Sequence, residues 1–223
     1  RAGAGTLAGI ESHPPPSGIH RPIDRRKHGD RCAVAKLTAH DQQFRVSTHQ
    51  VDAEINALAA RMADAGARSD LEIGSKFGGS LWRVAKSMPI GSRIVSVDLG
   101  HNGESLPACI KALRADGYDA HLIIGNSVEP DTIERARKLG PYDALFIDAN
   151  HKRMYVESDW RHYGPMAKLV AFHDIGWRRA TPASPNRITV PEFWNEIRGG
   201  FRHEEILLDP TGNAYGIGII WRC

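Results

Sequence analysis

Few cysteines, no long apolar run and little net charge characterise this sequence of 223 residues. Cys32, Cys109 and Cys223 are odd in number and far apart, which argues against a disulfide framework or a zinc knuckle. They predict reduced thiols in a cytoplasmic protein. No apolar run reaches the roughly 18 residues that a membrane helix needs. The N-terminal residues also lack the apolar core of a signal peptide, so we expect neither a membrane segment nor secretion.

The charge balance narrows the class of partner. The formal net charge is only +3, which indicates neither a nucleic-acid-binding protein nor one that binds an anionic membrane surface. A hydrophobic fraction of 41% and a charged fraction of 25% are typical of an ordinary globular protein. The sequence therefore predicts no nucleic-acid or membrane partner, and it leaves a homo-oligomer open.

Composition changes near residue 40. Residues 1–40 are rich in glycine and proline, carry the basic run Arg25–His28 and have little hydrophobic periodicity. Such a composition predicts an irregular N-terminal arm. Residues 41–223 are long enough for one domain with a substantial core.

Strands and helices alternate through this domain. Continuous apolar runs predict buried parallel strands at 70–74, 93–98, 120–125, 142–148 and 169–174. An amphipathic helix capped by Thr48 and ended by Gly66 is expected to cover a sheet edge, join a dimer or form a substrate lid. Further helices are predicted at 81–88, 105–117 (with Ser105 as the cap), 130–139, 155–163 and 192–197.

The C-terminal segment breaks this alternation. Residues 204–208 and 215–221 read as two strands that are separated by a turn too short for a crossover, so they must be antiparallel. The predicted fold class is therefore α/β: a doubly wound, mostly parallel, seven-stranded sheet with a C-terminal antiparallel hairpin.

A glycine-rich turn follows the first strand, in the pattern E-I-G-S-x-x-G-G-S from Glu72 to Ser80. It matches neither G-x-G-x-x-G nor the phosphate-binding G-x-x-x-x-G-K-[ST]. The pattern resembles the first motif of class I S-adenosylmethionine-dependent methyltransferases, in the small-molecule O-methyltransferase branch of cephalosporin-hydroxylase-like and macrolide-sugar enzymes. The alternative is a tight turn without a ligand. The resemblance implies a cofactor site that includes Glu72, Gly74, Ser75, Gly78, Gly79 and Ser80.

Two later motifs carry the same resemblance. The stretch from Leu145 to His151, with Val156 and Asp159 beyond it, is similar to I-D-G-[DN]-H-x-x-x-x-V-x-x-D of that branch, although Arg153 stands where a tyrosine is frequent. Ala171–Ile175 is similar to its A-F-H-D-I. The resemblance covers about residues 71–221 and implies a Rossmann-like fold that methylates a hydroxyl of a small metabolite, such as a sugar or a natural product.

Polar residues end each predicted parallel strand, at the sheet edge where α/β proteins bind ligands. Asp98 is placed to accept hydrogen bonds from a ribose, or alternatively caps a helix. Asn126 and Ser127 are placed for the adenine, or alternatively form a turn or cap the helix at 130. Leu99 and Asp148 complete the expected cofactor site.

The strand ends at 148 and 174 predict a metal site. Asp148 and Asp174, with His173, would bind Mg²⁺ or another divalent ion. Catechol-type O-methyltransferases, which the chain resembles at the level of the fold, have an amide directly after the second acid, but Ile175 stands there, so Asn150, His151 and His173 remain candidates for the third ligand. Both aspartates could instead be helix caps.

His151 is the expected catalytic residue, as the base that takes the hydroxyl proton. A histidine oriented by a backbone carbonyl is the alternative. Two rival functions remain: an oxidoreductase that uses NAD, and a non-catalytic cofactor-binding protein of the same fold. The loop 176–190 could act as a lid over the substrate.

Overall fold

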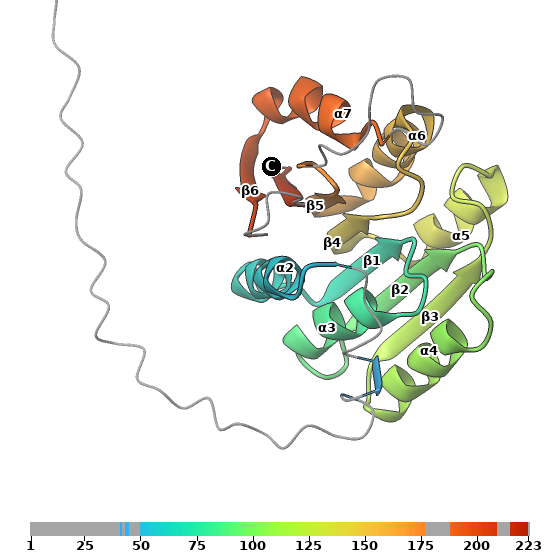
Figure 1. Ribbon diagram of the computed structural model, residues 1–223. Coiled ribbons are helices and arrows are strands. Elements are labelled where there is room, and N and C mark those ends of the chain that lie inside the picture. The colour runs from blue at the N-terminus through green and yellow to red at the C-terminus, as the bar shows by residue number, and fades with distance from the viewer. Residues whose placement is uncertain (1–40, 42, 45–49, 177–187, 209–214, 223) are drawn as a thin grey trace, which may run out of the picture. The chain divides into compact units, whose positions relative to one another are not determined.

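The computed structural model describes residues 41, 43–44, 50–176, 188–208 and 215–222 (Figure 1). The arm predicted for residues 1–40 lies outside the described residues. So do the expected cap Thr48, most of the expected lid (177–187) and the turn between the last two strands (209–214).

The described residues form one seven-stranded sheet. Its strands are β1 (Ser69–Ile73), β2 (Arg93–Asp98), β3 (Asp119–Ile124), β4 (Tyr142–Ile147), β5 (Ala167–His173), β6 (Arg202–Ile206) and β7 (Ile217–Trp221). The α-helices among these residues are α2 (Asp52–Asp64), α3 (Gly79–Ser87), α4 (Ser105–Ala115), α5 (Pro130–Leu139), α6 (Arg153–Tyr163) and α7 (Val190–Ile197). Two short 3₁₀ helices, η1 (Gly164–Met166) and η2 (Arg198–Gly200), follow α6 and α7.

The strand order is β3-β2-β1-β4-β5-β7-β6. Strands β1 to β5 pair in parallel, whereas β7 pairs antiparallel with both β5 and β6. The predicted fold class is confirmed, and each strand lies within two residues of its predicted limits. The chain order reverses between β1 and β4, which is where an α/β sheet opens a crevice at the carboxyl ends of its strands.

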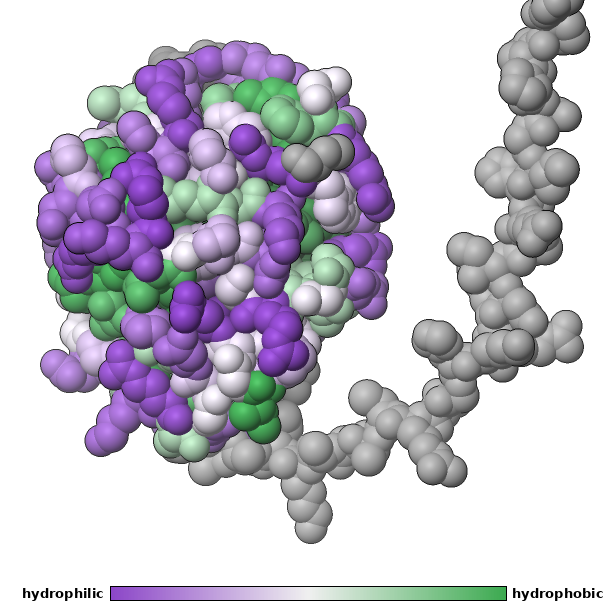
Figure 2. All heavy atoms as spheres, turned by 180° about the vertical axis from the view of Figure 1, so that it is seen from behind, coloured by the Kyte–Doolittle hydropathy of each residue, from purple (hydrophilic) through white to green (hydrophobic). Residues whose placement is uncertain are grey.

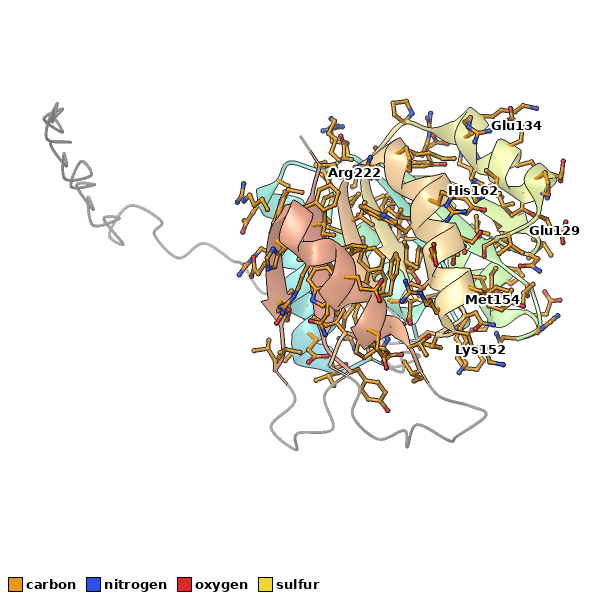
Figure 3. All side chains as sticks on the ribbon, turned by 90° about the horizontal axis from the view of Figure 1, so that it is seen from above. Glu129, Glu134, Lys152, Met154, His162 and Arg222 are labelled. Atoms are coloured by element: carbon orange, nitrogen blue, oxygen red, sulfur yellow. The ribbon has the colours of Figure 1, made fainter. Side chains whose placement is uncertain are left out.

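Apolar side chains cover both faces of the sheet. Leu71 and Ile73 of β1 belong to the core under α5, α6 and α7, while Ala144 and Phe146 of β4 belong to the core under α2, α3 and α4. Successive residues of a strand face opposite sides, so strands of continuous apolar sequence supply both cores. Figure 3 shows α5, α6 and α7 side by side over one face, with Lys152 and Met154 at the N-terminal end of α6 and His162 near its other end.

The starts of helices α2 and α4 can be compared with their predicted caps. Helix α2 begins after Val51, packs on α3 and contacts β6 and β7, which agrees with the alternative that it covers a sheet edge. Ser105 was expected to cap α4, but this is wrong: Glu104 is the cap residue and Ser105 is the first residue of the helix. The Ser105 hydroxyl instead donates to the carbonyl of Phe77 at 3.0 Å, and so ties α4 to the glycine-rich turn.

The surface fits an ordinary globular domain. Figure 2 shows one face covered mostly by hydrophilic residues, with smaller apolar patches between them. Among the described residues, no helix has the length and apolar character needed to cross a membrane.

Candidate functional site

A cavity of about 680 Å³ opens at the carboxyl ends of β1 to β5. Its volume lies within the range of small-molecule sites, about 300–1,000 Å³. Most of the residues predicted for the site line it. These are Gly74, Ser75, Ser80, Asp98, Leu99, Asn126, Ser127, Asp148, His151, His173 and Asp174.

Gly74 allows the first turn to pass close to the end of β4. Its φ is +92°, and a Cβ there would lie 2.4 Å from the carbonyl oxygen of Asp148 and 2.6 Å from the Cα of Ala149. Neither the backbone angle nor the space would accept a side chain. Gly74 therefore lets the ends of β1 and β4 form one continuous wall of the cavity.

Three residues predicted for the cofactor do not line the cavity: Glu72, Gly78 and Gly79. A Cβ on Gly78 would lie 2.7 Å from the side chain of Cys109, so this glycine provides room for α4. Glu72 is fully buried, and its Oε1 accepts a 2.6 Å hydrogen bond from the Ser80 hydroxyl. Burial raises the pKa of Glu72 well above its ordinary value. Glu72 thus joins β1 to the start of α3 behind the turn.

Asp98 holds two loops in place. Its Oδ2 accepts the backbone N–H of Lys76 at 2.9 Å, and its Oδ1 accepts that of Gly100 at 2.8 Å. Helix α4 begins only at Ser105, so Asp98 does not cap it. A carboxylate has about four lone-pair sites, so Asp98 keeps acceptor capacity for a ligand after these two bonds.

The loop after β3 is fixed from behind. The Tyr163 hydroxyl donates to the carbonyl of Ser127 at 2.8 Å, and the Asn126 side chain accepts from the N–H of Val128 at 3.4 Å. Helix α5 begins after Glu129 and has no side-chain cap, which removes the alternative of Asn126 or Ser127 as its cap. The contact between Asn126 and Val128 leaves the alternative of a turn in place.

Asp148 and Asp174 face each other across the ends of β4 and β5. The Nδ1 of His151 pairs with Oδ2 of Asp174, so a carboxylate rather than a backbone carbonyl orients this ring. Gln50 donates to Oδ2 of Asp148. The cap residues of α6 and α7 are Lys152 and Thr189, which removes the alternative that the two aspartates are helix caps.

His173 completes this group of charges. Its Nδ1 lies 2.9 Å from Oδ1 of Asp148 and 3.4 Å from Oδ1 of Asp174, without hydrogen-bond alignment to either. The ring is 5% exposed and stacks on Tyr215, with ring centroids 5.6 Å apart. Burial opposes its protonation, but the charges of Asp148 and Asp174 raise the pKa of His173 to about 9.

His151 is more accessible, with 36% of its side chain exposed. Burial disfavours its protonated form, but the hydrogen bond and charge of Asp174 outweigh that effect and raise its pKa. A histidine held at Nδ1 by a buried carboxylate, with part of its ring open to a cavity, has the geometry of a general base.

A divalent metal ion fits the same group. One ligand atom each from Asp148, His151 and Asp174 lies within 4.8 Å of the others. The grouping includes His151 in place of the predicted ligand His173. His173 nevertheless approaches one oxygen of each aspartate, so both histidines remain candidates beside the two carboxylates.

Several cavity residues were not predicted from the sequence. Lys76, His101 and Asn102 follow the first two strands and could have been found by extending the strand-end argument a few residues. Gln50 and Tyr215 come from distant parts of the chain, and no local pattern connects them to the site.

No family model matches the chain, and no curated protein sequence matches it. Solved structures do. The O-methyltransferase TomG from Streptomyces achromogenes, in complex with SAM, has a TM-score of 0.61 at 19% identity and covers 86% of this chain and 90% of its own. The O-methyltransferase from Bacillus cereus, in complex with SAH, has a TM-score of 0.60 at 18% identity, with coverages of 85% and 86%. A cofactor-bound protein from MTB has a TM-score of 0.61 at 19% identity, with coverages of 89% and 93%. At these identities the likeness shows a shared fold, that of class I methyltransferases.

Proposed function

We propose that this chain transfers a methyl group from S-adenosylmethionine to a hydroxyl of a small metabolite, such as a sugar or a natural-product intermediate. The observation that carries the proposal is the His151–Asp174 pair on the wall of a cavity that also contains Gly74 and Asp98. A base and a nucleoside-binding turn thus share one space. The class I methyltransferase fold and the three sequence motifs support the same activity.

The cofactor would lie over β1, β2 and β3. Gly74, Ser75 and Ser80 line the turn, Asp98 and Leu99 end the next strand, and Asn126 and Ser127 end the third. This assigns the ribose to Asp98 and the adenine to Asn126 and Ser127. Glu72, Gly78 and Gly79 would act by shaping the turn from behind, because they do not line the cavity.

S-adenosylmethionine supplies an electrophilic methyl group on a sulfonium, and the protein aligns the acceptor oxygen with it. His151 would remove the hydroxyl proton while Asp174, bonded at Nδ1, stabilises the imidazolium that forms. The electron pair left on the acceptor oxygen forms the new bond to the methyl carbon, and the electron pair of the broken carbon–sulfur bond returns to sulfur. Alignment and charge placement supply most of the rate enhancement.

A divalent ion at Asp148 and Asp174 would lower the pKa of the substrate hydroxyl.

We also propose a cytoplasmic location, with which the buried free thiol of Cys109 agrees.

Isothermal titration of the full chain with S-adenosylmethionine and S-adenosylhomocysteine tests the proposal. We expect both to bind with one site per chain. A folded protein that binds neither, and that instead quenches or enhances nicotinamide fluorescence, would be the rival oxidoreductase. Binding of both without methyl transfer to any hydroxylated metabolite in a broad screen would favour a non-catalytic protein of the same fold.

A further inference from the structure

Unpartnered polar atoms gather between the ends of β4 and β5. Both ring nitrogens of His173 and Oδ1 of Asp174 make no hydrogen bond among the described residues, although the two side chains are only 6% and 2% exposed. A buried polar atom left without a partner costs about 1–3 kcal/mol. Nδ1 of His173 and Oδ1 of Asp174 lie 3.4 Å apart and can share one partner that is not part of the chain, whereas Nε2 is on the other side of the ring.

The spacing of these atoms suits one coordination shell. His173 Nδ1 lies 2.9 Å from Oδ1 of Asp148 and 3.4 Å from Oδ1 of Asp174. Two neighbouring ligands that bind an ion at about 2.1 Å and at a right angle are about 3.0 Å apart. A hydrogen-bonded pair would have the same separation, but here the alignment of a hydrogen bond is missing.

The ring of His173 is fixed by packing against two aromatic rings. It stacks on Tyr215 at an interplanar angle of 12° and meets the edge of Phe146 at 78°. The next residue, Asp174, has a φ of +63°, an uncommon angle for a residue other than glycine. The packing and the backbone together direct both side chains to the same point.

The chemistry of the donor set points away from magnesium. Mg²⁺ prefers oxygen ligands and water, whereas imidazole nitrogen suits Fe²⁺, Co²⁺ and Zn²⁺. We propose that the ends of β4 and β5 bind a first-row transition-metal ion in preference to Mg²⁺, with Asp148, Asp174 and Nδ1 of His173 as its ligands. His151 then stays free to act as the base through its bond to the other oxygen of Asp174. The role of the ion rests on the proposed function, but its identity does not.

The test uses the metal-free full chain and measures binding rather than activity. Titrations with Co²⁺, Zn²⁺ and Mg²⁺ give the affinities, and the visible absorption of bound Co²⁺ reports nitrogen ligation. We expect Co²⁺ and Zn²⁺ to bind at least about 100-fold more tightly than Mg²⁺, because an imidazole ligand suits these ions whereas Mg²⁺ prefers oxygen ligands and gives up its water reluctantly. His173→Glu, which restores an all-oxygen set, should shift this ratio toward Mg²⁺ by about tenfold or more and change the Co²⁺ spectrum.

Matched variants separate the alternatives. His121 is a partly exposed histidine outside the cavity, with its Nε2 2.7 Å from Oδ1 of Asp119, so His121→Ala should leave the ratio and the spectrum unchanged. His173→Gln tests the nitrogen with a neutral side chain of similar size, and circular dichroism reports whether each variant folds.

Three results would overturn the inference: Mg²⁺ affinity equal to that of Co²⁺, no ion bound at all, or loss of nitrogen ligation in His151→Gln instead of the His173 variants. S-adenosylmethionine is titrated into the same samples. Binding of this cofactor together with any of those results rejects the ion assignment alone, whereas absence of cofactor binding rejects the proposed function.

Discussion

The cavity has two halves that differ in how their polar groups are satisfied. Over β1 to β3, Asp98 receives two backbone N–H groups and the carbonyl of Ser127 receives the Tyr163 hydroxyl. Over β4 and β5, both nitrogens of His173 and one oxygen of Asp174 have no hydrogen-bond partner among the described residues. We call these the cofactor half and the acid half.

This difference separates binding from chemistry. The cofactor half is arranged by its own backbone, so a ligand enters a site that already has its final shape and little ordering cost remains to be met on binding. The acid half keeps charged and unpartnered atoms, which are free to act on a proton or an ion. Variants in the first half should therefore change affinity, and variants in the second should change the rate of the bound complex.

The largest effect is expected for His151→Ala. Loss of a positioned general base should lower the rate of methyl transfer by about 10²- to 10⁴-fold. The affinity for S-adenosylmethionine should stay nearly unchanged, because His151 follows β4 and lies outside the cofactor half. Initial rates with the best acceptor from the metabolite screen, together with calorimetric affinities, measure the two quantities separately.

His101→Ala is the matched control, since His101 lines the same cavity from the cofactor half. The His101→Ala variant should change the affinity for S-adenosylmethionine more than the rate of methyl transfer. Asp174→Asn adds a second readout: without the carboxylate the pKa of His151 falls, so the rate should rise with pH at a lower pH than in the wild type. Equal losses of rate in the two histidine variants would contradict the division of the cavity.

The next effect concerns the support of the acid half. Glu54 of α2 is fully buried and accepts the backbone N–H of Leu208 at 2.9 Å and that of Gly216 at 3.0 Å, next to Tyr215. Glu54→Ala should lower the free energy of unfolding by about 3 kcal/mol, because two backbone N–H groups lose a charged acceptor. Urea denaturation measures this change.

Two variants calibrate that result. Glu54→Gln keeps one acceptor oxygen and should lose less stability. Glu134 pairs with Arg137 on the exposed surface of α5 (Figure 3), so Glu134→Ala should cost less than about 1 kcal/mol. Similar losses for Glu54→Ala and Glu134→Ala would mean that the hairpin does not depend on Glu54.

A smaller effect is expected in the cofactor half. Asp98→Ala removes the acceptor that holds the N–H groups of Lys76 and Gly100. The affinity for S-adenosylmethionine should fall by about 10- to 100-fold, the equivalent of one charge-assisted hydrogen bond. The affinity of Asp98→Asn for S-adenosylmethionine should lie between that of Asp98→Ala and that of the wild type. Asp119→Ala, at the opposite end of the neighbouring strand, serves as control in the same calorimetry, and an Asp98→Ala protein with wild-type affinity would exclude the ribose assignment.

The sequence predicted the fold well because its signals are local. Apolar runs such as Arg93–Asp98 end in a polar residue, and a turn too short for a crossover forces the last two strands to be antiparallel. The prediction that Ser105 caps α4 was wrong because it depended on a contact that is not local in the sequence. A serine at a helix start can donate to a neighbouring segment instead of capping, and only the tertiary contact with Phe77 decides between the two.

The site was predicted less completely. Strand ends identify Asp98, Asp148 and Asp174, since the direction of each strand fixes where its last residue lies. Side-chain direction is not encoded locally. The room that Gly78 provides is filled by Cys109, a residue 31 positions away, and Gln50 reaches Asp148 across 98 positions. Such contacts depend on the packing of whole elements, which the motif alone does not contain.

The smallest effect per pH unit is expected for Asp70, and it tests whether a buried atom that shows no hydrogen bond really lacks a partner. Asp70 lies on β1 away from the cavity, is fully buried, and has no hydrogen-bond partner for either carboxyl oxygen among the described residues. Burial raises its pKa to about 8. From about pH 4 to pH 8 the folded protein keeps a proton that the unfolded chain releases, so stability should fall by up to about 1.4 kcal/mol per pH unit and then level off. Asp70→Asn should remove this slope in urea denaturation at pH 5 to 8. Glu72 is present in both proteins, but besides burial the charge of Asp70 also raises the pKa of Glu72, so the change in slope reports Asp70 together with its effect on Glu72. Parallel stability curves would mean that Asp70 has a partner, and that missing hydrogen bonds do not single out the acid half.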